Sequence, residues 1–249
     1  MKSLCPTNLA SLSQPSSRRM AQIPDSAILD LWDNGACEHP LDRALGLIAL
    51  VESELSREEL AALPIAERDR RLFDVTEAVF GSQLALSATC TLCGAESELT
   101  FSVSDINELG SPDTERRVLR HDGRDYPYRM PNSRDLANAL RAPDPQQALI
   151  LSVLDRTEAD DALIAACDAA LEAQSGLEAL SLKFDCAECG AAEDAPFDIL
   201  DYLWTRITAE ARRLMWDIHL LARSYGWTSR EILSLSPLRR AEHVAMVSA

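Results

Sequence analysis

Hydrophobic residues recur at helical spacing along most of this chain, and short alternating stretches interrupt them in three places. The longest helical pattern runs from Leu200 to Tyr225 without glycine or proline, and its apolar residues form one heptad stripe. The members of the stripe are Leu200, Trp204, Ile207, Ala211, Leu214, Ile218, Leu221 and Tyr225. This pattern predicts a long helix that packs along its length, either against its own chain or against a partner.

Capping residues mark where the shorter helices begin and end. Ser56–Glu59 and Thr228–Glu231 match the capping-box pattern, and His39 precedes a proline at another helix start. Gly81 and Gly226 follow apolar helical stretches and are expected to end them. The sequence therefore predicts helices that begin near residues 38, 56, 64, 132, 144, 158, 200, 228 and 236.

Alternating polar and apolar residues predict strands near 83–89, 97–103 and 180–184, and a separate hairpin between 117 and 130 that turns at Asp122-Gly123. The first three strands flank two pairs of cysteines, so we expect the strands around the cysteines to form one small sheet. The expected fold class is α+β, mostly α-helical, with helical bundle segments around a small β unit.

Two copies of the pattern Cys-x-x-Cys-Gly provide the strongest chemical signal in the chain. Cys90 and Cys93 belong to the first copy and Cys186 and Cys189 to the second, and 92 residues (94 to 185) lie between them. A tight turn aims both sulfurs of each pair at one point, and four thiolates complete a tetrahedral structural zinc site. We therefore predict zinc bound by these four cysteines. A redox dithiol or disulfide pair and a rubredoxin-like iron centre use the same residues and stay open as alternatives.

These elements divide the chain into five predicted parts. They are a flexible serine- and proline-rich arm (1–24), an N-terminal helical region (25–82), a zinc-ribbon-like unit made of two segments (83–104 and 178–197), an inserted hairpin with helices (105–177) and a C-terminal helical module (198–249). The metal is thus expected to connect segments that lie far apart in the sequence.

Three further cysteines have no obvious pairing partner. Cys5 lies in the predicted arm, and Cys37 and Cys167 are expected to be buried as small hydrophobic residues. Seven cysteines without a disulfide framework suit a reducing compartment, so the predicted location is the cytoplasm.

The charge and the missing motifs exclude several classes of function. A net charge of −16 argues against general nucleic-acid binding, because proteins that neutralise phosphates show a basic face. The C-terminal end is the basic region of the sequence. From Thr205 onward it contains seven arginines and four acidic residues, a net charge of +3, whereas the rest of the chain has a net charge of −19. No apolar run reaches the roughly 18 residues of a membrane helix. The sequence also lacks the common catalytic motifs, so we expect no enzymatic activity and no small-molecule substrate.

Two sets of residues add a resemblance to these patterns. The first set comprises His39-Pro40-Leu41-Asp42-Arg43-Ala44, Leu63-Pro64 with Glu67-Arg68-Asp69, and Phe80-Gly81 before the first cysteine pair. The second comprises Asp198-Ile199, Leu203-Trp204, His219-Leu220-Leu221-Ala222, Tyr225-Gly226-Trp227, Glu231-Ile232-Leu233, Leu235 and Arg239-Arg240. Together they resemble a family encoded in the gene clusters of phage tails and phage-like contractile injection systems, and the C-terminal set also resembles the T-even phage baseplate hub proteins.

The resemblance implies a non-enzymatic baseplate or hub assembly factor, whose partners are baseplate or hub proteins of the same gene cluster. Its location would then be the cytoplasm or an assembled tail-like particle. We expect the partner-binding residues to be Tyr225, Trp227, Arg239 and Arg240, because this segment shows the most specific part of the resemblance. Alternatively, Trp227 fills the core and the arginines pair with nearby acids. A zinc-ribbon adaptor or regulatory protein that binds a protein partner is the second interpretation of the whole chain.

Overall fold

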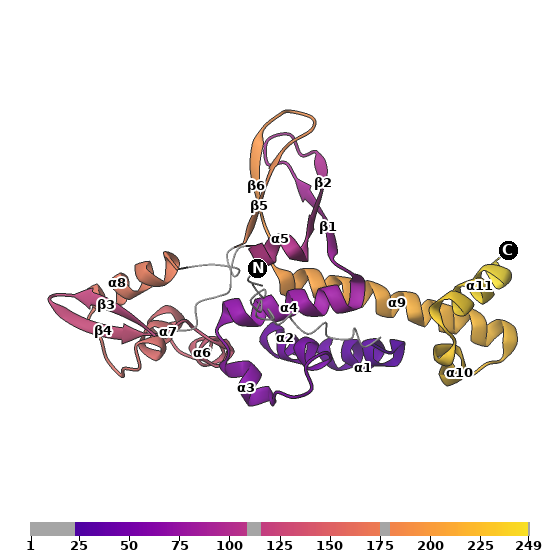
Figure 1. The fold of residues 1–249 in the computed structure, drawn as a ribbon, viewed down its shortest axis with the longest axis horizontal. Helices are drawn as coiled ribbons and strands as arrows, with labels where there is room; N and C mark the ends of the chain where they lie inside the picture. The colour runs from indigo at the N-terminus through magenta and orange to yellow at the C-terminus, as the bar shows by residue number, and fades with distance from the viewer. Residues whose placement is uncertain (1–22, 109–115, 175–179, 249) are drawn as a thin grey trace, which may run out of the picture.

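The structure, a computed structural model, describes residues 23–108, 116–174 and 180–248 (Figure 1). Within these ranges it contains eleven helices and six strands, and the strands form three separate antiparallel pairs. The protein is therefore α+β and mostly helical, as the sequence predicts. A pair of hairpins, a lobe containing β3 and β4, and the C-terminal helices project from a helical centre in different directions (Figure 1).

The helical centre holds the main hydrophobic core. It is built by α1 (Asp25–Gly35), α2 (Pro40–Ala49), α3 (Arg57–Ala62), α4 (Ile65–Phe80) and the first half of α9 (Ile199–Tyr225). Fully buried side chains of this core include Leu47, Ile48, Leu72, Phe73, Leu203 and Ile207. Because α9 lies far from the other helices in the sequence, this core forms only when distant segments of the chain come together.

Arg43 fixes the joint between α1, α2 and α9. Its guanidinium donates to the Gly35 carbonyl oxygen (2.7 Å) and lies 4.5 Å from the centre of the Trp204 ring. The Trp204 ring packs directly on Gly35, where an added Cβ would come within 2.6 Å of the ring. His39 caps α2 as predicted, because its Nδ1 accepts the Leu41 amide (3.2 Å). The residues around Pro40 therefore have a structural role in this joint.

The heptad stripe of α9 packs against helices of the same chain. Leu200, Ile207, Ala211, Leu214 and Leu221 are buried, Trp204 and Ile218 are half-buried, and Tyr225 is exposed. α1 and α4 pack on the part of α9 near the centre, and α10 (Ser229–Ser234) and α11 (Pro237–Ser248) pack on its far end (Figure 1). The stripe is therefore intramolecular packing, the first of the two alternatives that the pattern allows.

The C-terminal helices are held to α9 and to α1 by a buried ion-pair network. Gly226 ends α9 in the left-handed conformation (φ 70°), and the Thr228–Glu231 capping box opens α10, as predicted. Arg240 of α11 donates to Asp217 of α9 (3.2 Å) and to Asp25 of α1 (2.6 Å). The last helix is thus tied to the first helix as well as to α9.

The inserted lobe has a hydrophobic core of its own. Its elements are β3 (Arg117–His121), β4 (Arg124–Tyr128), α6 (Ser133–Ala139), α7 (Pro145–Val153) and α8 (Asp161–Glu172). The core side chains are Tyr128, Ile150, Val153, Leu154, Leu163 and Cys167. The turn between the strands has positive φ at Asp122 (47°) and Gly123 (72°), as a type I′ hairpin requires, so the predicted hairpin is confirmed.

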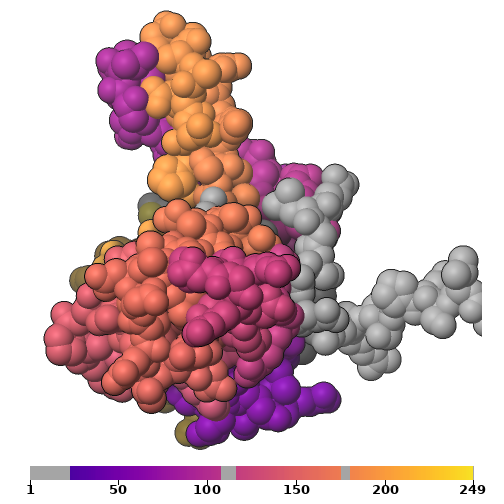
Figure 2. Space-filling view, turned by 90° about the vertical axis from the view of Figure 1, so that its left-hand side faces the viewer, coloured from indigo at the N-terminus to yellow at the C-terminus, as the bar shows by residue number. Residues whose placement is uncertain are grey.

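The strands around the cysteines do not form the single sheet that we expected. β1 (Gln83–Thr89) pairs only with β2 (Glu96–Ser102), and β5 (Ser181–Asp185) pairs only with β6 (Ala192–Pro196). Each Cys-x-x-Cys turn folds its own segment back on itself, and this leaves two hairpins side by side (Figures 1 and 2). A short helix, α5 (Val103–Glu108), follows β2. We call the two hairpins, residues 83–102 and 181–196, the cysteine arm.

The remaining differences from the sequence-based expectations are local. α8 begins at Asp161, three residues after the predicted start near residue 158. Cys167 is buried as predicted, but Cys37 is exposed, because it lies in the link between α1 and α2 rather than inside a helix. Cys5 and the predicted arm up to residue 22 lie outside the described residues.

Candidate metal centre

The first cysteine pair lies in a tight turn at the end of β1. The Cys90 amide donates to the Ala95 carbonyl oxygen (2.8 Å), and the Gly94 amide donates back to the Cys90 carbonyl oxygen (3.0 Å). Gly94 has φ 74°, a conformation that residues with a Cβ rarely adopt. This turn therefore depends on the glycine after the second cysteine, and it brings the Cys90 and Cys93 side chains to the same side.

The second cysteine pair repeats this geometry at the end of β5. The Cys186 amide donates to the Ala191 carbonyl oxygen (2.9 Å), and the Gly190 amide donates to the Cys186 carbonyl oxygen (2.8 Å). Gly190 has φ 70°. The two segments are thus two copies of one local structure, as their identical spacing predicts.

The two turns face each other and bring all four thiols together. The Cys90 and Cys189 sulfurs are 3.7 Å apart, the Cys93 and Cys186 sulfurs are 3.6 Å apart, and the four sulfurs lie within 4.8 Å of one another. Four sulfurs placed tetrahedrally at about 2.3 Å from a metal ion are separated by about 3.8 Å. The predicted ligands therefore lie together in a geometry that fits a tetrahedral metal site.

The surroundings of the thiols differ from those of a redox dithiol. A thioredoxin-type cysteine pair opens a helix, whereas Cys93 is followed by β2 and Cys189 by β6. Hydrogen bonds from the Cys189 and Glu188 amides lower the pKa of the Cys186 thiol to about 7. At Cys90, Cys93 and Cys189 similar amide hydrogen bonds are outweighed by burial and the neighbouring thiols, which raise the pKa of these three thiols. Amides directed at sulfur stabilise the thiolate form that metals bind. The strands that follow both turns, rather than the pKa values, distinguish this site from a thioredoxin-type dithiol.

Glu193 connects the two hairpins beside the thiols, a role that no sequence pattern indicates. Its carboxylate, on β6, accepts hydrogen bonds from the Thr91 amide (3.2 Å) and the Thr91 hydroxyl (2.8 Å) in the first turn. The same carboxylate lies 3.4 Å from the Cys90 sulfur. The Thr91 hydroxyl is the main cause of a lowered pKa at Glu193. These hydrogen bonds fasten the first turn to the second hairpin and so hold Cys90 beside the second cysteine pair.

A metal ion held tetrahedrally by all four cysteines would keep no coordination position for a substrate or a water molecule. Cys90 and Cys186 are buried and Cys93 and Cys189 are exposed. A metal ion with four protein ligands is closed, unlike a catalytic site, which keeps an open position. Among residues 23–108, 116–174 and 180–248 this is the group of cysteine, histidine and carboxylate side chains that could hold a metal ion.

The expected partner-binding residues do not form one exposed surface. Tyr225 is 41% exposed and stacks on the half-buried Trp227 at 4.7 Å between ring centres, and His243 contacts both rings edge-on. Arg239 is exposed, but Arg240 is buried with 1% of its surface exposed. The expectation that Arg240 presents a contact surface is therefore wrong. Consecutive helix residues point about 100° apart, and in this helix Arg240 faces Asp217 of α9 while Arg239 faces solvent.

Comparison with protein family models, with curated proteins and with solved structures finds no match for this chain. In the part of the chain that the structure describes, no helix has the length and apolar character needed to span a membrane. The function must therefore be argued from the cysteine site, the arrangement of the elements and the sequence resemblance.

Proposed function

We propose that Cys90, Cys93, Cys186 and Cys189 bind one structural zinc ion. The spacing of the sulfurs and the four-thiolate ligand set support this proposal, because zinc is the usual occupant of closed tetrahedral sites of this kind. A single iron ion uses the same ligands. Metal analysis of the purified protein, together with its visible absorption spectrum, separates the two, since a ferric tetrathiolate is coloured and a zinc tetrathiolate is not.

We further propose that the protein is a metal-stabilised, non-enzymatic assembly or adaptor protein. The observation that supports this class best is the closed cysteine site, which joins hairpins from distant parts of the chain and leaves no position for substrate. The cysteine arm, the inserted lobe and the C-terminal helices each extend from the helical centre (Figure 1). Three separate exposed parts suit a protein that contacts several partners.

Within this class, we propose a baseplate or hub assembly factor of a phage-tail-like contractile injection system. The support is the sequence resemblance, above all the segment from Tyr225 to Arg240. In the structure this segment comprises the last residue of α9, α10 and the start of α11, at one end of the main core (Figure 1). Exposed apolar residues occur on several sides of these helices and include Met215, Trp216, Tyr225, Leu238 and Met246, any of which can contact another protein.

The proposal is tested by deleting the gene and imaging the particles made by its gene cluster. We expect sheath and tube proteins without complete baseplates, and rescue by the wild-type gene. A Trp216→Ala, Leu238→Ala double variant should fold but rescue poorly, whereas an Arg57→Ala variant, altered on the exposed surface of α3, should rescue fully. Normal particles in the deletion strain would contradict a role in assembly.

A zinc-ribbon adaptor or regulatory protein remains a second candidate because of one feature of the cysteine arm. Leu92 lies between the cysteines of the first turn and is 77% exposed, the highest value among the large apolar residues described. An apolar side chain at the tip of a projecting arm suits a protein contact. If particles form normally without the gene and a Leu92→Asp variant loses a specific partner, this second function replaces the first.

A further inference from the structure

The inserted lobe carries arginines along its hairpin and around an open cavity. The cavity, of about 420 Å³, is lined by Arg116, Arg124, Arg156, Tyr126, Asp125 and Asp155 among others. Residues 116–129 contain five arginines and two aspartates. The C-terminal end is therefore not the only basic region of this acidic chain, as the sequence had led us to expect.

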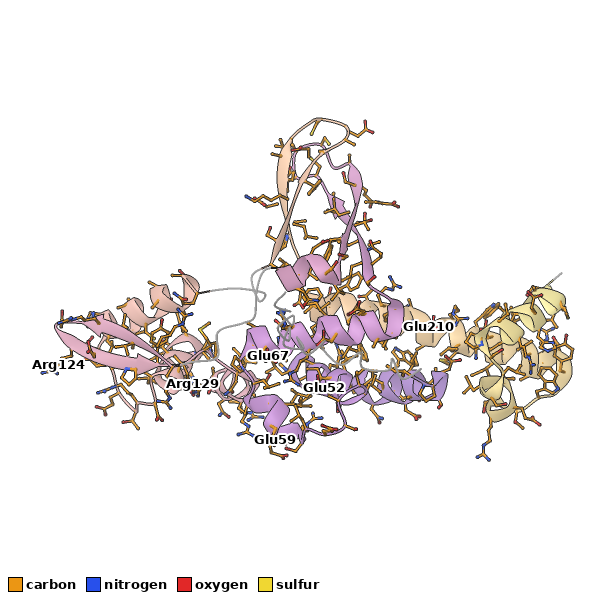
Figure 3. All side chains as sticks on the ribbon, in the orientation of Figure 1. Glu52, Glu59, Glu67, Arg124, Arg129 and Glu210 are labelled. Carbon is orange, nitrogen blue, oxygen red and sulfur yellow. The ribbon has the colours of Figure 1, made fainter. Side chains whose placement is uncertain are left out.

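The guanidinium groups at this cavity are incompletely neutralised. Arg116 approaches Asp155 only to 4.0 Å, and Arg156 lies over the Tyr126 ring at 5.6 Å from its centre. Arg124, at the free end of the hairpin, has no ion pair among the described residues (Figure 3). The cavity thus keeps positive charge that an acidic group can neutralise.

Apolar side chains lie beside this charge on the face of the hairpin that no helix covers. Val118 is directly opposite Pro127 in the register, and Arg120 is opposite Asp125. All four residues are exposed, Val118 to 62%. Arginine next to exposed apolar surface is typical of protein interfaces. We call Arg116, Val118, Arg120, Arg124 and Arg156 the basic end.

The cysteine arm has the complementary character. Its two hairpins contain six acidic residues against the single basic residue Lys183, a net charge of −5. Its tip exposes Leu92 and Glu188. The arm stands clear of the inserted lobe, so the acidic arm and the basic end of one molecule do not cover each other (Figures 1 and 2).

We propose that the basic end of one copy of this protein binds the acidic cysteine arm of a second copy. The two surfaces differ, so the contact is head-to-tail and can continue into a ring or a chain of copies. Carboxylates of the arm would neutralise Arg116 and Arg124, and Leu92 would meet the apolar strip at Val118. This inference is independent of the proposed assembly function, because it concerns self-association alone.

Electrostatics favours this occupant over a nucleic acid. A polyanion brings one charge per phosphate to a chain of net charge −16, whereas the arm brings a local net charge of −5 and the exposed apolar Leu92. Two copies also repel each other at long range, but at about 0.15 M salt charges farther apart than about 8 Å are largely screened. The local complementarity between the basic end and the arm then decides the contact.

Sedimentation velocity of the full-length, metal-loaded protein over a range of concentrations tests the proposal. We expect a reversible species heavier than the monomer at about 0.15 M salt, lost at about 1 M salt, where screening extends to about 3 Å. An Arg116→Glu, Arg124→Glu variant should weaken association roughly 10-fold or more, since like charges would then face each other. Both side chains are exposed, so the fold should survive, as circular dichroism would verify.

A matched control and a charge exchange make the test specific. An Arg212→Glu, Arg223→Glu variant changes the net charge equally on the exposed side of α9 and should associate like wild type. A Glu98→Arg, Glu188→Arg variant should be monomeric alone but should associate when mixed with the Arg116→Glu, Arg124→Glu variant.

A monomer at all concentrations, or association that survives reversal of the basic end, would overturn the proposal. Binding of a labelled oligonucleotide by monomeric protein would do so too and would assign the cavity to nucleic acid.

Discussion

Removing the metal ligand Cys186 should destabilise the protein because metal binding is coupled to folding. The ligands Cys93 and Cys186 have 92 residues between them, so the unfolded chain holds no preformed site and the free energy of metal binding adds to the free energy of folding. A complete structural zinc site contributes about 10–16 kcal/mol in zinc-finger peptides, and losing one of four ligands should cost roughly 4 kcal/mol. At about 2–4 °C per kcal/mol for a chain of this size, Cys186→Ser should lower the melting temperature by about 10 °C or more.

The effect should also be confined to particular segments. A two-stranded hairpin is at best marginally stable in water. The main core consists chiefly of side chains from α1, α2, α4 and α9. Hydrogen exchange should therefore show residues 83–102 and 181–196 losing protection in Cys186→Ser, or after chelation, while α2, α4 and the first half of α9 keep most of theirs.

The control for this measurement is Cys37→Ser, which removes an exposed thiol outside the site and should change stability by less than about 0.5 kcal/mol. Metal content is measured on the same samples. If wild-type protein contains no stoichiometric metal, or if Cys186→Ser melts together with wild type, the four cysteines do not form a structural metal site.

Three further predictions concern residues that the structure places in specific contacts. Arg240→Leu should destabilise the protein by about 3 kcal/mol in chemical denaturation, because it leaves buried Asp217 with fewer partners, whereas exposed Arg239→Leu should be nearly neutral. Glu193→Ala should lower metal affinity roughly 10-fold in a chelator competition, and Glu193→Gln, which still accepts from the Thr91 hydroxyl, should lower it less. Burial raises the pKa of Asp135, but hydrogen bonds from Arg129 outweigh it and leave the pKa below its usual value. Its stabilising effect is therefore present above about pH 4 and lost as the pH falls through the folded-state pKa, and an acid titration of Asp135→Asn should lack this loss.

Local features of this fold could be predicted because the information lies within a few residues. The capping boxes at Ser56–Glu59 and Thr228–Glu231 and the turn at Asp122-Gly123 all appear where the sequence predicts them. The four residues of the cysteine site could also be predicted, because each Cys-x-x-Cys-Gly pattern is local and two copies supply the four thiolates of a tetrahedral metal site.

Features that depend on distant contacts could not be read from the sequence. The partner of Arg240 is Asp25, 215 positions away, and no local pattern indicates that pair. Glu193 acquires its role only because the second hairpin lies against the first. Register within each hairpin follows from the turn, but pairing between hairpins depends on their orientation, and this is why the expected single sheet was wrong.

The order of segments along the chain has a consequence for how the protein is made. At typical synthesis rates of about 5–20 residues per second, the ribosome completes the first cysteine turn about 5–20 seconds before the second. During that interval the inserted lobe can fold, because it has a core of its own. Cys90 and Cys93 meanwhile lack the other two metal ligands, Cys186 and Cys189, which have not yet been synthesised. The core of α1, α2 and α4 also stays incomplete, because α9 supplies part of its buried side chains. A nascent chain that stalls within the lobe therefore exposes both an open thiol pair and an open hydrophobic face, two signals by which chaperones and proteases can recognise it.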